Sequence, residues 1–221
     1  MYEPRRRMVW CGWSGGRCPL LCYSWSRRPL PRPEHHLEFR TQQRTCRDST
    51  VNVACYVTAI AWNRQRLLAR PDVARVILEE VEFYRSKYKY CFCGFVIMPD
   101  HWHFVFITDE EKISPVLRDM KSMIARLVVD KWKKTPDGTR LLEKICLPVG
   151  EKRQHTYSLW QEGNWKTLIE QPSQIERRLD YMHANPIRAG LVERAEDWKL
   201  SSYRWYEFRE PVGATIDMDW F

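Results

Sequence analysis

The chain has 221 residues, of which 44% are hydrophobic and 29% charged, and this composition of an ordinary globular protein excludes wholesale disorder. It contains no run of about 18 apolar residues, which excludes a transmembrane helix. The first 22 residues have no continuous apolar core of the kind that a secretory signal needs. We therefore expect a soluble, cytoplasmic protein.

The net charge of +8 is concentrated at the start of the chain. Residues 1–50 carry ten arginines and four acidic residues, whereas the other 171 residues carry 26 basic and 24 acidic side chains. Residues 1–48 also combine an arginine run, a glycine pair and a proline-rich stretch without periodicity. They are predicted to be a disordered basic extension or the product of a start codon set too early, and a DNA-contacting tail is the alternative. The folded domain is predicted to span residues 49–221.

The first half of this domain alternates between strand and helix patterns. Residues 51–60 read as a strand of β-favouring residues, and Pro71-Asp72 opens a helix. That helix has one apolar stripe, made by Val73, Ile77, Val81 and Tyr84. Residues 90–98 are apolar on both faces, which predicts a central strand. A turn at Pro99-Asp100 leads into a third strand over 101–108.

The second half is predicted to hold two helices and a further strand. Ser114-Pro115 reads as the N-cap and first turn of a helix that runs to about Lys134. Its expected apolar stripe is Val116, Met120, Ile124 and Leu127. Residues 135–138 read as a loop, 156–160 and 165–169 as short extended segments, and 173–185 as a helix that ends before Pro186.

This order predicts an α+β, ferredoxin-like two-layer sandwich. Its antiparallel sheet would be covered by helices on one face, and a short C-terminal extension would follow.

Two histidines provide the sharpest chemical signal. Strand side chains alternate, so His101 and His103 face the same side and Trp102 faces the other. Two imidazoles at this spacing can converge on one divalent cation. They can equally be polar residues on a solvated face, and spacing alone leaves both readings open.

A polar strip lies on the last predicted helix. Tyr181 and Asn185 are four residues apart and Arg178 precedes Tyr181 by three, so the three side chains share one edge. Taken alone, Tyr181 could be a boundary residue packed on the sheet, and Asn185 could simply end the helix.

Taken together, these two motifs resemble the REP-associated tyrosine transposases of the HUH endonuclease superfamily. The resemblance rests on His101-Trp102-His103 after Met98-Pro99-Asp100, and on the segment from Leu179 to Val192, LDYMHANPIRAGLV. It covers about residues 50–221 and implies that Tyr181 is the nucleophile, that His101 and His103 are metal ligands and that Asn185 is a third ligand. It also implies Mg²⁺ or Mn²⁺ as cofactor and a 5′-phosphotyrosine intermediate.

The implied partner is single-stranded DNA with palindromic hairpins. Basic residues expected to contact it are Lys121, Arg126, Lys131, Lys133, Arg178 and Arg188, although a solvated helix face would explain each of them as well. Trp132, Trp160 and Trp165 could stack on unpaired bases.

Two other functions remain open: a metal-dependent hydrolase that activates water, and a catalytically inactive DNA-binding module. The sequence also leaves open whether the site forms within one chain or in a homodimer.

Overall fold

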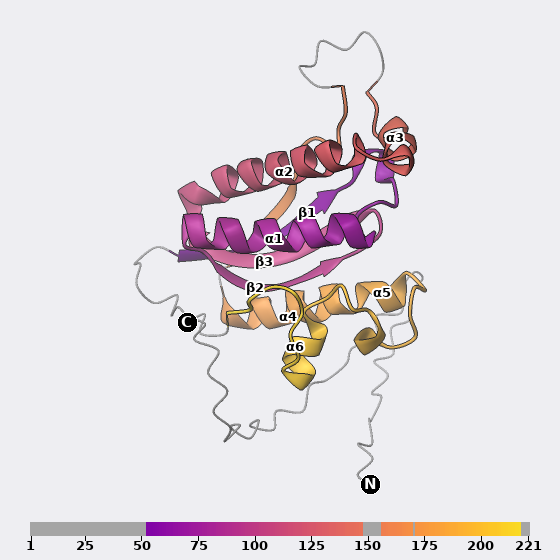
Figure 1. The fold of residues 1–221 in the computed structure, drawn as a ribbon. Helices are drawn as coiled ribbons and strands as arrows, with labels where there is room; N and C mark the ends of the chain where they lie inside the picture. The colour runs from indigo at the N-terminus through magenta and orange to yellow at the C-terminus, as the bar shows by residue number, and fades with distance from the viewer. Residues whose placement is uncertain (1–51, 148–155, 170, 218–221) are drawn as a thin grey trace, which may run out of the picture. The chain divides into compact units, whose positions relative to one another are not determined.

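Four antiparallel strands form the sheet that organises the described residues, which are 52–147, 156–169 and 171–217 of this computed structural model (Figure 1). The strands are β1 (Asn52–Ile60), β2 (Cys91–Ile97), β3 (His101–Asp109) and β4 (Trp165–Ile169). Their order across the sheet is β2-β3-β1-β4, and every neighbouring pair is antiparallel. The predicted α+β class with an antiparallel sheet is confirmed. The prediction for residues 1–48 lies outside the described residues.

Helices cover both faces of the sheet (Figure 1). Alternate residues of the strands, such as Phe104 and Phe106 of β3, pack against α1 (Pro71–Tyr88) and α2 (Glu110–Trp132). On the other face, Val105 and Ile107 pack against α4 (Pro172–His183). The prediction of helices on one face therefore holds for α1 and α2, but α4 adds a third layer. Since β2 and β3 carry apolar side chains on both faces, each face needs its own cover.

The remaining helical segments are short. They are η2 (Trp62–Arg64), α3 (Pro136–Glu143), α5 (Asn185–Arg188), η3 (Ala195–Asp197) and α6 (Tyr203–Phe208). No helix in the described ranges is long and apolar enough to cross a membrane.

Strand β2 lies at an edge of the sheet, so the prediction of a central strand is wrong. Its full burial has another cause, because the C-terminal segment covers its outer edge. Ile97 N donates to Leu200 O at 2.8 Å, and Ser202 N donates to Phe95 O at 2.9 Å. Pairing of this kind satisfies the open edge without a further strand.

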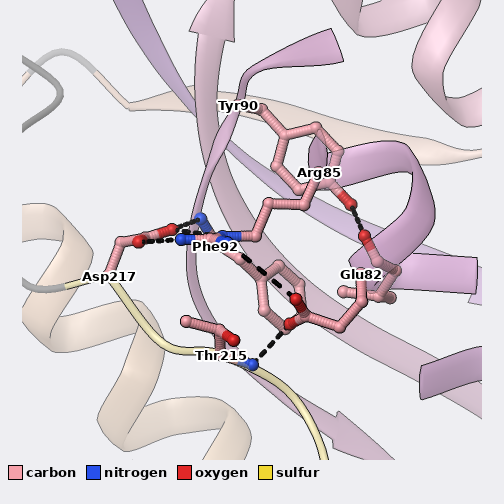
Figure 2. Close-up of polar contacts among 7 residues, drawn as sticks. Glu82, Arg85, Tyr90, Phe92, Thr215 and Asp217 are labelled. Atoms are coloured by element: carbon pink, nitrogen blue, oxygen red, sulfur yellow. Dashed lines mark hydrogen bonds and ion pairs between the residues drawn. The ribbon is translucent and has the colours of Figure 1, made fainter. Parts of the chain in front are cut away.

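Asp217, at the end of the described chain, is fastened to α1 by an ion pair and to β2 by a hydrogen bond (Figure 2). The carboxylate of Asp217 accepts hydrogen bonds from Arg85 Nε and from the backbone N–H of Phe92, both at 2.8 Å. Arg85 also reaches Asp217 through Nη2, and the backbone N–H of Thr215 donates to Glu82, which like Arg85 belongs to α1. The segment before residue 218 is thereby tied to both α1 and β2.

Several predicted boundaries are corrected by the structure. Helix α2 begins at Glu110, so Pro115 lies inside it, and Val128 takes the buried position expected for Leu127.

The predicted loop at 135–138 starts α3, because the Thr135 hydroxyl accepts a hydrogen bond from Gly138 N at 3.1 Å and caps the helix. Residues 156–160 make only isolated bridges, and α4 ends at His183 with Pro186 near the start of α5.

Candidate functional site

The two histidines lie side by side on the α4 face of β3. Their ring centroids are 4.7 Å apart and the rings are inclined at 78°. His103 is 8% exposed, and its ring stacks on Tyr56 of β1 at 5.4 Å. The alternation expected from the sequence therefore places both imidazoles on one face, with Trp102 in the core on the other.

Each imidazole has its Nδ1 atom occupied by a neighbouring oxygen. His103 Nδ1 lies 2.8 Å from the Thr58 hydroxyl, and His101 Nδ1 lies 2.7 Å from Asp100 Oδ1. Asp100 is itself paired with Arg64 at 3.1 Å. Oxygen partners at Nδ1 orient histidines that bind a metal through Nε2. The pair is thus built as two oriented ligands would be.

The protonation state of His103 also suits a ligand. Burial, with a smaller contribution from His101, lowers the pKa of His103 to about 3, so this ring is neutral at physiological pH. Burial would raise the pKa of Asp100, but the hydrogen bond with His101 and the charge of Arg64 lower it further than burial raises it. The site therefore combines the neutral imidazole of His103 with the ionised carboxylate of Asp100, which contacts His101.

Helix α4 brings Tyr181 to this same face of the sheet. The guanidinium of Arg178 lies 5.2 Å from the centroid of the Tyr56 ring, which in turn stacks on His103. Burial raises the pKa of Tyr56, and the nearby Tyr181 raises it further. Arg188 lies over the Tyr181 ring at 4.3 Å, and 42% of Tyr181 is exposed. An exposed phenol thus lies beside one guanidinium, and a second guanidinium lies over the neighbouring Tyr56 ring.

Asn185 follows Tyr181 by four residues, at the start of α5. Its side-chain Nδ2 is buried and has no hydrogen-bond partner in the structure. The described ranges contain no group of three or more His, Cys, Asp or Glu side chains that could hold a metal. Within the described ranges, the histidine pair is therefore not completed by a third side chain of these types, and the role of Asn185 as a third ligand stays a prediction.

The six predicted DNA-contacting residues divide between the two faces. Arg178 and Arg188 lie on the site face. Of the other four, three belong to α2 on the opposite face and Lys133 directly follows its last residue. Lys121 is also engaged: its Nζ donates to Gly163 O and to Asn164 Oδ1, both at 2.9 Å.

Two more residues of that set, Arg126 and Lys133, lie near Asp130 at 3.9 and 4.0 Å. Lys131 is exposed on the same helix. The six residues therefore do not form one continuous basic surface, and their contact with DNA stays a prediction.

The sequence reasoning did not single out Thr58 or Tyr56 as parts of this site. Both are alternate residues of β1, so the strand pattern already places them on one face of the sheet. What identifies them is the register, in which Thr58 pairs with His103 and Tyr56 with Val105. Asp100 was seen only as a turn residue.

The strand order, the oriented histidine pair and the tyrosine-bearing helix across the same face define a ferredoxin-like α+β protein with a candidate nucleic-acid site. No protein-family model matches the sequence. The chain is nevertheless similar to proteins named as REP-associated tyrosine transposases. One, from Haemophilus influenzae, is 31% identical over 126 residues, which cover 56% of this chain and 62% of the relative.

A second relative, from Escherichia coli, is 26% identical over 74 residues, 31% of this chain and 42% of its own. The match therefore spans less than two thirds of either relative. A solved structure of a REP-associated tyrosine transposase bound to a REP hairpin shares the fold, with a TM-score of 0.52 at 16% identity. The superposition covers 75% of this chain and 86% of that one. The resemblance drawn from the two motifs is confirmed.

Proposed function

We propose that this chain is a single-tyrosine transposase that cuts and rejoins single-stranded DNA carrying palindromic hairpins. The observation that supports the proposal is that α4, which bears Tyr181, packs on the sheet face that carries the two histidines. Tyr181 also lies near Tyr56, whose ring stacks on His103. The two motifs are about eighty residues apart in the sequence. The hairpin partner is proposed because a relative of the same fold is described as bound to one.

In the proposed reaction, the Tyr181 oxygen attacks the scissile phosphorus. A phosphorus–oxygen bond to the tyrosine forms, and the bond to the 3′ oxygen breaks. That oxygen takes up a proton, while the phenolic proton leaves to solvent through the exposed side of the ring. The products are a 5′-phosphotyrosine and a free 3′-hydroxyl, and the reverse attack by a hydroxyl rejoins the strand. The covalent link keeps the phosphoester energy, so the reaction needs no ATP.

Arg188 and Arg178 would stabilise the negative charge of the reacting groups. A phenol with a pKa near 10 is a poor nucleophile at neutral pH, so the reaction depends on positioning and on nearby positive charge. The Arg188 guanidinium lies 4.3 Å from the centroid of the Tyr181 ring. Both arginines can also bind the phosphate, since the planar guanidinium matches its oxygens.

The histidine pair fits a divalent cation, because each ring has Nδ1 occupied and His103 is neutral. We propose that His101, His103 and Asn185 hold Mg²⁺ or Mn²⁺. A cation there would polarise a non-bridging oxygen of the phosphate.

The test is formation of a covalent protein–DNA adduct, resolved by denaturing electrophoresis. The substrates are hairpin-bearing single strands taken from the DNA that flanks the gene, with Mn²⁺ present. We expect an adduct with the wild-type chain and none with Tyr181→Phe. Tyr88→Phe is the matched control, because Tyr88 lies on α1 and bonds Asp119 on the opposite side of the sheet.

Two outcomes would overturn the proposal. Cleavage with turnover but no adduct would indicate a hydrolase that activates water. DNA binding that survives His101→Ala, without cleavage in Mn²⁺, would indicate a binding module.

A further inference from the structure

Trp165 is the exposed tryptophan of the described part of the chain. Its side chain is 76% exposed, whereas Trp132 and Trp160 are 2% and 6% exposed. The indole N–H groups of these two donate to Asp72 and to Lys121 O, as expected of tryptophans that serve the core. Of the three tryptophans that the sequence suggested for base stacking, only Trp165 presents its ring to solvent.

Strand register places Trp165 on the face of the candidate site. Thr58 of β1 pairs with His103 on one side and with Trp165 on the other, so the three residues form one row across the sheet. Neighbouring strands are about 4.8 Å apart, which puts Trp165 roughly 10 Å from His103 along that row.

The side chains of β4 confirm this orientation. Ile169, four residues after Trp165, packs in the core cluster of α4. Lys166 points the other way, and its Nζ donates to Ser114 of α2 at 3.3 Å.

The backbone that carries Trp165 is held in place. Lys121 on α2 donates to two groups of the preceding turn, Gly163 O and Asn164 Oδ1. The same ammonium lies 5.8 Å from the centroid of the Trp160 ring. A large exposed ring on a fixed backbone loses little conformational freedom when a flat ligand stacks on it.

We infer that Trp165 is a stacking platform for an unpaired base of the bound single strand, next to the phosphate that lies at the histidine pair. The inference rests on the proposed function, since the strand must cross this face. Stacking on an aromatic ring is open to every base, because each has a π face. The row from His103 to Trp165 continues the site directly, and Arg178 and Arg188 supply positive charge on the same face.

The test is a binding measurement in the Tyr181→Phe background, where no adduct consumes the probe. The probe is a fluorescently labelled hairpin with single-stranded flanks, and its abasic derivatives each lack one flanking base. Trp165→Ala is expected to raise Kd by about 5- to 100-fold, as stacking of one base would. Trp165→Phe should restore most of the affinity. One abasic position should weaken binding to the parent and have no further effect on Trp165→Ala.

Leu168→Ala is the matched control, because Leu168 is also exposed on β4 but pairs with Cys55 on the other face. It should leave Kd unchanged, and Trp165→Ala should leave the melting temperature unchanged.

An abasic scan with the same profile in parent and Trp165→Ala overturns the inference, and so does a Trp165→Ala chain that changes oligomeric state instead of base dependence. The adduct assay reports on the proposed function separately. An adduct together with an abasic scan that shows no dependence on position would support the transposase and reject the stacking site. Base-dependent binding without an adduct would reject the transposase and support the stacking site.

Discussion

Replacing Thr58 with valine removes the hydroxyl that orients His103 and keeps the shape of the side chain. The Thr58 oxygen lies 2.8 Å from His103 Nδ1, and His103 is only 8% exposed, so water has little room to take its place. A buried donor that loses its partner costs about 1–3 kcal/mol. Loss of a hydrogen-bonding partner behind a metal-binding histidine lowers metal affinity by about 10- to 100-fold, which is the same range of free energy.

The assay measures adduct yield as a function of Mn²⁺ concentration. In parallel, the melting temperature is measured over the same Mn²⁺ concentrations in the absence of DNA. In Thr58→Val, the Mn²⁺ concentration at half-maximal yield should rise by about 10- to 100-fold, and saturating Mn²⁺ should restore the yield. Thr58→Ser keeps the hydroxyl and should behave as wild type. Thr167→Val changes a threonine of β4 that pairs with Tyr56 and should have no effect. An unchanged half-maximal concentration in a folded Thr58→Val chain would refute the role given to this hydroxyl.

Three further predictions concern stability, measured by urea unfolding. A Cβ at Gly94 would lie 2.6 Å from Leu179 Cδ2 and 2.9 Å from Met182 Cε. Gly94→Ala should therefore destabilise the chain by about 1–3 kcal/mol. No loss of stability would mean that α4 can move away from β2. Asp217→Asn removes the nearer carboxylate from the mostly buried Arg85 and should cost about 3 kcal/mol. Asp119→Asn, at a half-buried ion pair with the exposed Arg118, should cost under about 1 kcal/mol, and equal effects would contradict the importance of the Arg85–Asp217 pair. Burial lowers the pKa of His183 to about 3, so its contribution to stability is complete above pH 6.5 and is lost as the pH falls towards 3. The loss at pH 5.5 should be about 1.4 kcal/mol, and a His183→Gln chain with the same acid sensitivity as wild type would reject this source.

The fold class and the spacing within the two motifs follow from local patterns. Period-two alternation places His101 and His103 on one face of a strand wherever that strand lies. Helical spacing likewise predicts Tyr181 and Asn185 on one edge, although α4 ends at His183 and Asn185 begins α5. These relations need no knowledge of the neighbours. Helix ends were harder to predict, because α3 depends on a hydroxyl cap and on close contact of Gly138 with the end of α2.

What the sequence alone determined is therefore which side chains share a face of their own element. Only the tertiary structure decided which faces meet. Helix α4 covers the histidine side, Thr58 pairs with His103, and the basic residues of α2 lie on the opposite side of the sheet. The physical reason is that β2 and β3 are apolar on both faces, so local pattern cannot tell which helix covers which side. That choice is made by packing and strand register across the whole domain.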